Sequence, residues 1–178
     1  MPNDEKRAFI RSMGKLRPAS VLVETGTFQG ETIEALRGDF TRLITIELFE
    51  PLYAAAREKF RGDTHVEPYL GDSAVLLPGI IRDIPQPIVF WLDGHYSGPG
   101  TAHENICPVL AELDAIFARN REDDIILIDD ARLFGWRQGY PSKGNIRSRV
   151  ATRRPGATVK ISSDIIAIIR AEEAALVT

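Results

Sequence analysis

Acidic side chains stand at the ends of five short apolar runs of the sequence. They are Glu24, Glu47, Asp72, Asp93 and the pair Asp129–Asp130. Such runs are typical of buried strands, and ligands of open α/β sheets bind beyond the carboxyl ends of the strands. We therefore expect the functional site at that edge, where carboxylates attract a positive group or accept hydrogen bonds from hydroxyls.

The first of these ends is a glycine-containing loop, Glu24-Thr25-Gly26-Thr27-Phe28-Gln29-Gly30. Gly26 and Gly30 allow a tight turn and a close approach of the backbone to a ligand. The pattern is not Gly-x-Gly-x-x-Gly, and no lysine follows as in a phosphate-binding P-loop. A plain strand–turn–helix connection accounts for the loop equally well, so the loop alone assigns no ligand.

The next two ends could contact a nucleoside. Glu47 lies 21 positions after Gly26, and an acidic side chain there can accept hydrogen bonds from both hydroxyls of a ribose. A solvated surface glutamate is the alternative. Asp72 and Ser73 could contact the amino group of an adenine, although Asp72 is also suited to cap a helix.

The last two ends bring three carboxylates to neighbouring strands. Asp93, Asp129 and Asp130 would form a hard oxygen-donor site suited to magnesium. Alternatively, Asp93 contacts only a cofactor and Asp129 caps a turn. His95 could act as a general base, because the unperturbed pKa of histidine lies near neutrality. It could equally be a metal ligand or a loop residue without a role.

The elements that position these residues alternate along the chain, which predicts a parallel sheet covered by helices on both faces. We expect strands at 21–23, 43–46, 66–70, 88–92 and 125–128, and helices at 31–37, 51–60, 73–81 and near 145–152. A further helix carries Ile106, Leu110, Leu113 and Phe117 on one face. Strands at 158–161 and 165–169 form a terminal hairpin that adds one antiparallel strand.

Composition excludes several classes of protein. The chain has 178 residues, which fits one domain spanning 1–178, and its 44% hydrophobic and 26% charged residues are ordinary for a globular protein. No apolar run approaches the ~18 residues of a transmembrane helix, and the first residues lack the apolar core of a signal peptide. Cys107 is the only cysteine, so an internal disulfide is excluded. We expect a cytoplasmic protein without a membrane partner.

Basic residues are concentrated in one segment. Residues 131–163 contain eight lysines and arginines and no acidic residue, although the net charge of the chain is −3. This segregation predicts a negative substrate, which Arg132 and Arg137 could grip bidentately. A solvated basic face is the alternative. Nucleic acid is a weaker candidate, since the chain is acidic overall and its aromatic and basic residues do not alternate.

The chain resembles the class I S-adenosylmethionine-dependent methyltransferases between Val21 and Arg170. Five stretches carry the resemblance: VETGTFQGET, TIELFEP, YLGDSAVLLPG, IVFWLDGHYSG and IILIDDARLF. The family implies a Rossmann-like, doubly wound seven-stranded sheet, mostly parallel, with its last strand antiparallel in a C-terminal hairpin. It also implies a bound S-adenosylmethionine, for which the matching positions are Glu24, Gly26, Thr27, Phe28, Gly30, Glu47, Leu48, Asp72, Ser73 and Asp93.

The acidic residues at the fourth and fifth strand ends are similar to those of the metal-dependent O-methyltransferases, especially the macrocin O-methyltransferase-like group that modifies sugar hydroxyls. This implies magnesium on Asp93, Asp129 and Asp130, beside a small-molecule acceptor such as a sugar or glycoside. Asp93 or His95 would take the hydroxyl proton. Tyr96, Arg132 and Arg137 would contact the acceptor, and Trp136 could line its pocket.

The N-terminal region departs from that group, whose members usually have a longer one that helps close the acceptor pocket. Only about twenty residues precede the first expected strand. The acceptor site is then open, or it is covered by residues 97–101, by residues 132–144, or by another subunit of a homo-oligomer.

Two other functions compete with methyl transfer. One is a nucleotide-dependent oxidoreductase on a Rossmann-like sheet, against which the missing Gly-x-Gly-x-x-Gly argues. The other is a non-catalytic binding protein that retains the fold and docks an anion through its basic segment.

Overall fold

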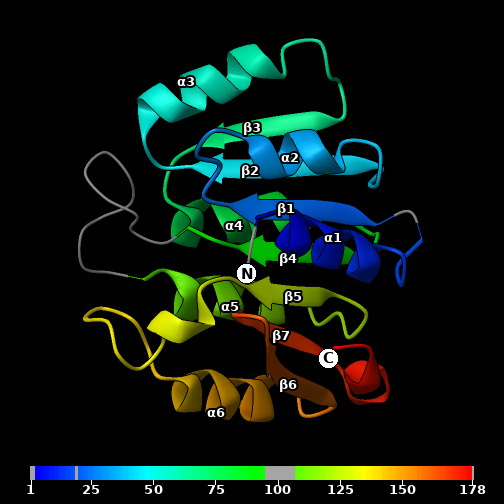
Figure 1. Cartoon of the computed structure of the whole chain (residues 1–178), viewed down its shortest axis with the longest axis vertical. Helices are drawn as coiled ribbons and strands as arrows, with labels where there is room; N and C mark the ends of the chain where they lie inside the picture. Colours follow the sequence, from blue (N-terminus) through cyan, green and yellow to red (C-terminus); the bar gives the residue numbers. More distant parts are fainter. Residues whose placement is uncertain (1–2, 19, 95–106, 178) are drawn as a thin grey trace.

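Parallel pairing of buried strands builds the centre of the fold. The computed structural model describes residues 3–18, 20–94 and 107–177, and these form a seven-stranded sheet in the order β3-β2-β1-β4-β5-β7-β6 (Figure 1). The strands are β1 (Val21–Thr25), β2 (Arg42–Glu47), β3 (Val66–Leu70), β4 (Ile88–Leu92), β5 (Ile125–Ile128), β6 (Ala157–Ser162) and β7 (Ile165–Arg170). β7 is antiparallel to both of its neighbours, β5 and β6, and the other neighbouring pairs of these described strands are parallel. The expected fold class is confirmed.

The order of the strands reverses between β1 and β4. From β1 the chain proceeds outward through β2 to β3, and then returns to place β4 on the other side of β1. Thr25 at the end of β1 is in register with Ile46 of β2 and Leu92 of β4. The acidic strand ends therefore meet at one edge of the sheet, at the switch point where open α/β sheets bind ligands.

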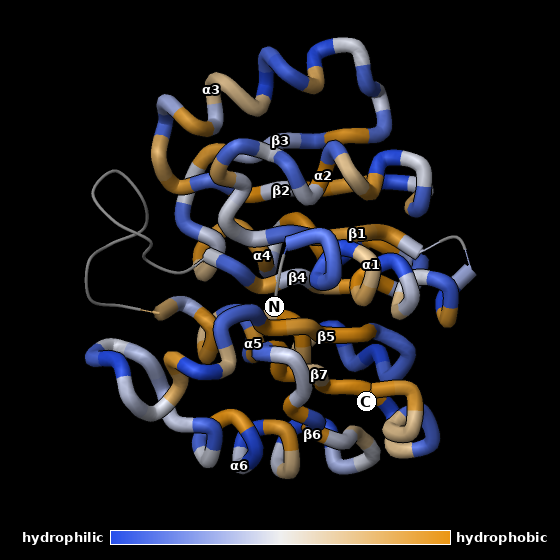
Figure 2. The backbone as a smooth tube through the Cα atoms, viewed as in Figure 1, coloured by the Kyte–Doolittle hydropathy of each residue, from blue (hydrophilic) through white to orange (hydrophobic). Residues whose placement is uncertain are grey.

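Helices cover both faces of the sheet because successive strand residues point to opposite sides (Figures 1 and 2). Val21 and Val23 pack in one buried cluster, whereas Leu22 between them packs in the other. The first cluster includes residues of α4 (Ser73–Ile81), α5 (Val109–Ala118) and α6 (Lys143–Arg153), and the second includes residues of α1 (Asn3–Gly14), α2 (Glu31–Leu36) and α3 (Glu50–Lys59). Two short 3-10 helices, η1 (Ala131–Leu133) and η2 (Ala171–Leu176), complete these elements.

Local capping sets several boundaries that periodicity misses. The helix expected near 145–152 begins at Lys143, because Ser142 and Asn145 form a capping box. The hairpin turn is shorter than expected: Ser163 and Asp164 both adopt positive φ, so β6 extends to Ser162. The apolar face of α5 contains Leu113 and Phe117, while Ile106 lies outside the described residues.

The first helix, α1, was not expected from the sequence. It has acidic residues in its first turn and buries Ile10 and Met13, which pack with residues of α2 and β4. The N-terminal segment therefore lies over the sheet near the end of β1 (Figure 1). Residues 97–101, one expected cover of the acceptor site, lie outside the described residues, and how that site is covered stays a prediction.

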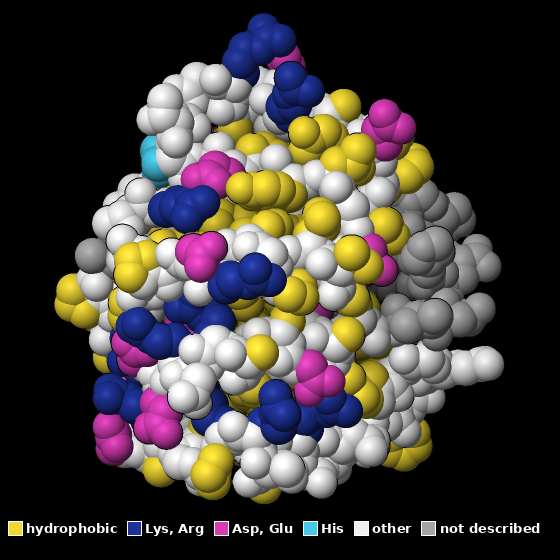
Figure 3. Space-filling view, turned by 180° about the vertical axis from the view of Figure 1, so that it is seen from behind, with side chains coloured by type: hydrophobic (Ala, Val, Ile, Leu, Met, Phe, Trp, Pro, Cys, Tyr) yellow, Lys and Arg dark blue, Asp and Glu magenta, His cyan; other side chains and the backbone are white. Residues whose placement is uncertain are grey.

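Charged side chains of both signs are interspersed over the face seen in Figure 3. Several bases of segment 131–163 are already engaged. Arg149 pairs with Asp114, and the buried Arg154 donates to the carbonyls of residues 122 and 124. Within the described residues, no helix is both long and apolar enough to cross a membrane.

Truncation of a central core residue tests the packing. Phe90 of β4 is fully buried, so Phe90→Ala removes its transfer free energy and leaves a cavity. We expect a loss of about 3–5 kcal/mol in the free energy of unfolding, measured by urea denaturation. Val75 of α4 is 71% exposed, and Val75→Ala serves as the control with little change. Similar losses for both variants would contradict the assigned core.

Candidate functional site

A pocket lies where the ends of β1, β4 and β5 meet helix α1. It holds about 500 Å³ of space, including the part that opens to solvent. Glu24, Asp93 and Asp129 line it from the strand ends, and Lys6 and Arg7 line it from α1. The loop after β1 supplies Gly26, Thr27 and Phe28, all of which were expected at a ligand site.

Gly26 allows the close approach of two strand ends. Its φ is +84°, and a Cβ atom built there would lie 2.5 Å from the carbonyl oxygen of Asp93. Any side chain at this position would therefore push the β1 loop away from the end of β4. The result is a loop whose backbone is exposed to the pocket.

Glu24 is a buried carboxyl group held by a chain of hydroxyls. Thr45 donates a hydrogen bond of 2.7 Å to Glu24 Oε2, and the hydroxyls of Thr27 and Thr45 are 2.6 Å apart. Burial, and then the nearby charge of Asp93, raise the pKa of Glu24 from its ordinary 4.5 to about 8. A ligand with a positive group in this pocket would favour the ionised form.

Glu47 is fixed beside the same loop by the backbone. Its Oε2 accepts from the N–H of Phe28 and its Oε1 accepts from the N–H of Phe49, each at 2.9 Å. Phe28 adopts a left-handed conformation, with φ of 47°, to direct its N–H at this carboxylate. Each carboxylate oxygen can accept more than one hydrogen bond, so both keep capacity for a ligand hydroxyl.

The residues expected near an adenine have local structural partners. Asp72 caps α4 by accepting from the N–H of Ala74 at 2.9 Å, which is the alternative recognised from the sequence. The hydroxyl of Ser73 donates to the buried Glu112 at 2.6 Å. Neither residue lines the pocket described above, and their contact with adenine stays a prediction. Leu48 lies between Glu47 and Phe49 and is half-buried.

Lys6 of α1 contacts the carboxylates at the end of β5. Its Nζ lies 2.7 Å from each carboxylate oxygen of Asp129 and 3.7 Å from Asp130. Asp129 also accepts from the N–H of Asp130 at 2.6 Å. Burial and the charge of Asp93 raise the pKa of Asp129, and the contact with Lys6 opposes this.

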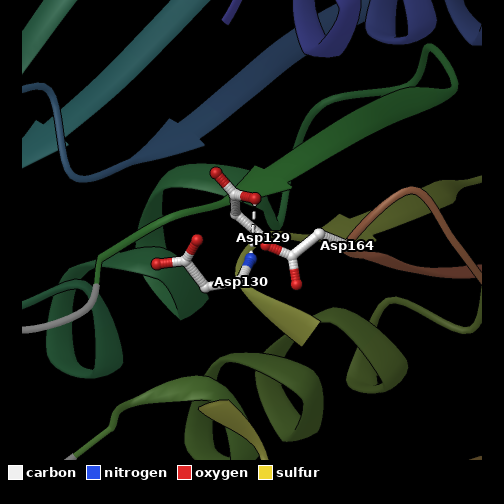
Figure 4. Close-up of side chains that lie close together, drawn as sticks. All are labelled: Asp129, Asp130 and Asp164. Carbon is white, nitrogen blue, oxygen red and sulfur yellow. Dashed lines mark hydrogen bonds between the residues drawn. The ribbon is translucent and has the colours of Figure 1, made fainter. Parts of the chain in front are cut away.

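The acidic group brought together here differs from the expected one. Its members are Asp129, Asp130 and Asp164, with one oxygen of each within 4.8 Å of the others. Figure 4 shows their carboxyl groups pointing in different directions, with Asp164 coming from the β6–β7 turn. Asp93 does not belong to this described group, although it faces the same pocket as Asp129.

These carboxylates are suitable donors for magnesium but already neutralise two basic side chains. Lys6 lies on Asp129 and Asp130, while Arg132 contacts Asp130 at 2.9 Å and also Asp164. The ammonium of Lys6 lies within hydrogen-bond distance of both oxygens of Asp129 and occupies the position of an ion chelated by that carboxylate. The arrangement therefore does not fit a resident divalent ion.

The residues expected to bind the acceptor are only partly described. His95 and Tyr96 lie outside the described residues. Arg132 is engaged by Asp130 and Asp164, and Arg137 lies over the ring of Tyr140 at 5.6 Å. Trp136, next to Arg137, is 88% exposed. The acceptor roles of these residues stay predictions.

Sequence reasoning missed Lys6, Thr45 and Asp164. Lys6 precedes the first strand, and its contact with Asp129 spans 123 positions. A weak signal existed in the acidic first turn of α1 followed by Ile10 and Met13 at helical spacing. Asp164 falls in the turn between the strands expected at 158–161 and 165–169.

Solved structures share this architecture. The O-methyltransferase TomG from Streptomyces achromogenes, in complex with S-adenosylmethionine, gives a TM-score of 0.67 at 17% identity, covering 96% of this chain and 82% of its own. An O-methyltransferase from Bacillus cereus, in complex with S-adenosylhomocysteine, gives 0.67 at 17%, with 96% and 83% covered. The N-methyltransferase NodS from Bradyrhizobium japonicum gives 0.61 at 13%, with 94% and 95% covered. The chain therefore has the Rossmann-like fold of these methyltransferases.

Sequence comparison adds no closer relationship. No protein-family model matches the chain, and no curated protein sequence matches it significantly.

The raised pKa of Glu24 predicts a pH-dependent stability. Because its folded-state pKa of about 8 exceeds the ordinary 4.5, the native state retains a proton that the unfolded chain loses between these values. The contribution is fully present below pH 4.5 and is lost as the pH rises through 8, by at most about 5 kcal/mol. Glu24→Gln stays neutral, so we expect its stability relative to wild type to rise from pH 5 to pH 8 in urea unfolding. Glu58, whose side chain is 64% exposed, provides the control variant Glu58→Gln. A difference between Glu24→Gln and wild type that is independent of pH would contradict the assignment.

Proposed function

We propose that this protein is an S-adenosylmethionine-dependent methyltransferase that methylates a hydroxyl of a small molecule. One observation carries the proposal: two backbone N–H groups fix the Glu47 carboxylate beside a glycine loop whose pocket also contains the buried Glu24. The fold shared with solved methyltransferases supports it. The TomG complex contains S-adenosylmethionine. A site that combines carboxylates with an accessible loop backbone suits this cofactor.

The chain's residues fit the parts of this cofactor. The lack of a Cβ atom at Gly26 lets the loop lie against the carbonyl of Asp93, and Gly26 lines the pocket. Glu47 would accept hydrogen bonds from the two ribose hydroxyls, and Glu24 would face the positive groups of the methionine portion. Leu48, Asp72 and Ser73 would lie near the adenine. When bound, the cofactor supplies a methyl group activated by its sulfonium charge.

The acceptor is proposed to be a hydroxyl, as on a sugar or glycoside. With the cofactor bound, its methyl group would be transferred to the hydroxyl oxygen, S-adenosylhomocysteine would be released, and the protein would have to accept the hydroxyl proton. Asp93, or His95 two positions later, would accept the hydroxyl proton. The remaining task of the protein is alignment of the oxygen with the methyl group.

We propose that this reaction proceeds without the magnesium that the resemblance to metal-dependent enzymes implies. Lys6 and Arg132 already neutralise the carboxylates that would bind the ion. The metal role expected for Asp93, Asp129 and Asp130 is tested by measuring methyl-transfer activity in excess EDTA. The metal content of the protein is measured in the same samples. Full activity without metal is the expected result.

Calorimetric titration tests the proposed cofactor. S-adenosylhomocysteine and S-adenosylmethionine should bind with one site per chain, whereas NAD should not bind. Turnover is then measured with a panel of sugars and glycosides. Binding of NAD alone would favour an oxidoreductase, and cofactor binding without turnover of any acceptor would favour a non-catalytic binding protein.

Glu47→Ala should weaken binding of S-adenosylhomocysteine at least tenfold. Each of its two charge-assisted hydrogen bonds to ribose contributes about 1.5–3 kcal/mol. Since Glu47 also anchors the N–H groups of Phe28 and Phe49, Glu47→Gln is measured beside it, because it retains an acceptor for the loop. Glu58→Gln is the exposed control. An unchanged dissociation constant in folded Glu47→Ala would refute the ribose role.

Arg137→Glu tests whether the acceptor carries a negative group. Arg137 is exposed, and losing a charge-assisted hydrogen bond should raise the KM for a phosphate-bearing sugar about tenfold. The affinity for S-adenosylhomocysteine should stay unchanged. Arg153→Glu, on exposed Arg153 at the end of α6, is the control. A preference for neutral acceptors, or an unchanged KM, would show that the basic segment is only a solvated face.

A further inference from the structure

The pocket gathers carboxyl groups. Glu24, Asp93 and Asp129 reach it from the ends of three strands that lie side by side in the sheet, and Glu24 keeps its proton up to a pKa of about 8. Asp130 and Asp164 lie next to Asp129. Like charges so close together destabilise one another in a partly buried site unless a cation lies among them.

Lys6 is placed to be that cation for Asp129, whereas Arg132 pairs with Asp130 and Asp164. The Nζ of Lys6 lies at the same 2.7 Å from both oxygens of Asp129, and its side chain is only 12% exposed. The distance to Asp130 is 3.7 Å. A partly buried lysine that contacts two carboxylates in a pocket differs from an exposed surface ion pair, because water screens it less.

The helix that carries Lys6 is anchored to the body of the protein. Ile10 and Met13 are buried on its inner face. Arg7 pairs with Glu31 of α2 at 2.6 Å, and Arg11 pairs with Asp39 at 2.8 Å. These contacts hold α1 over the strand ends and keep Lys6 beside Asp129.

We infer that Lys6 serves as the resident cation of the carboxylates of Asp129 and Asp130. Its ammonium keeps divalent ions from binding there. A divalent ion bound to both oxygens of Asp129 would need the space that the ammonium fills. Magnesium approaches carboxylate oxygens to about 2.1 Å, which brings it into contact with an ammonium 2.7 Å from the same atoms. An ion bound to both oxygens and the ammonium are therefore mutually exclusive. The inference rests on the ion pairs and not on methyl transfer.

The consequence is that removal of the ammonium should create a divalent-cation site. Mn²⁺ is titrated into the protein without cofactor or acceptor, and bound ion is followed by electron paramagnetic resonance. Wild type should show no saturable binding at millimolar Mn²⁺. Lys6→Met, which keeps an unbranched side chain without charge, should bind one ion at least tenfold more tightly. Lys15 is exposed just beyond α1, and Lys15→Met should behave as wild type.

Further variants locate the gained site. Asp130→Asn in the Lys6→Met background should abolish the new binding. Lys6→Gln provides a second substitution if Lys6→Met does not fold, as judged by circular dichroism. Saturable Mn²⁺ binding by wild type, or its absence from both folded Lys6 variants, overturns the inference. Because no turnover is measured, these outcomes are independent of whether the protein transfers methyl groups.

Discussion

The contact between the Gly26 backbone and the carbonyl of Asp93 sets the geometry on which the site depends. A Cβ atom on residue 26 would lie only 2.5 Å from that oxygen. The loop after β1 can therefore lie against the end of β4 only if residue 26 is glycine. The N–H of Gly26 donates to Ile46 at 2.9 Å, and the N–H of Asp93 donates to Thr25 at 3.0 Å. The ends of β1, β2 and β4 are thereby joined, and their carboxyl groups lie at one edge of the sheet, where Glu24 and Asp93 line the pocket.

Placing several carboxyl groups close together costs electrostatic free energy. A different neighbour offsets this cost for each group. Thr45 donates to Glu24, two backbone N–H groups donate to Glu47, and Lys6 contacts Asp129. Glu24 accepts a hydrogen bond from a hydroxyl and has no basic partner among the described residues, which agrees with the large rise of its pKa. Asp129, in contrast, forms an ion pair with the ammonium of Lys6. The pocket thus contains one carboxyl group sensitive to a positive ligand and one whose charge the chain balances itself.

The sequence was informative where structure is local. Alternating burial in the strands, acidic residues at strand ends and the terminal hairpin follow from short-range patterns, and the sheet was predicted correctly. Helix α1 was missed because its charged sequence gains order mainly from burying Ile10 and Met13. The Lys6–Asp129 contact was also missed, because a pairing across 123 positions leaves no local pattern in the sequence. Asp164 reaches Arg132 only after the β6–β7 hairpin has docked on β5.

The residues that contact the carboxylates at the end of β5 come from elements outside the parallel sheet. The glycine loop and Glu47 belong to the β1–β2 unit, whereas Lys6 comes from α1, Arg132 from η1 and Asp164 from a hairpin turn. A fold shared by O- and N-methyltransferases at 13–17% identity leaves the acceptor undefined. A helix that places a lysine on the strand-end carboxylates determines which cation lies at the site. It does so without any change in the strands of the sheet. Differences in acceptor chemistry within this fold should therefore be sought in what covers the strand ends rather than in the strands themselves.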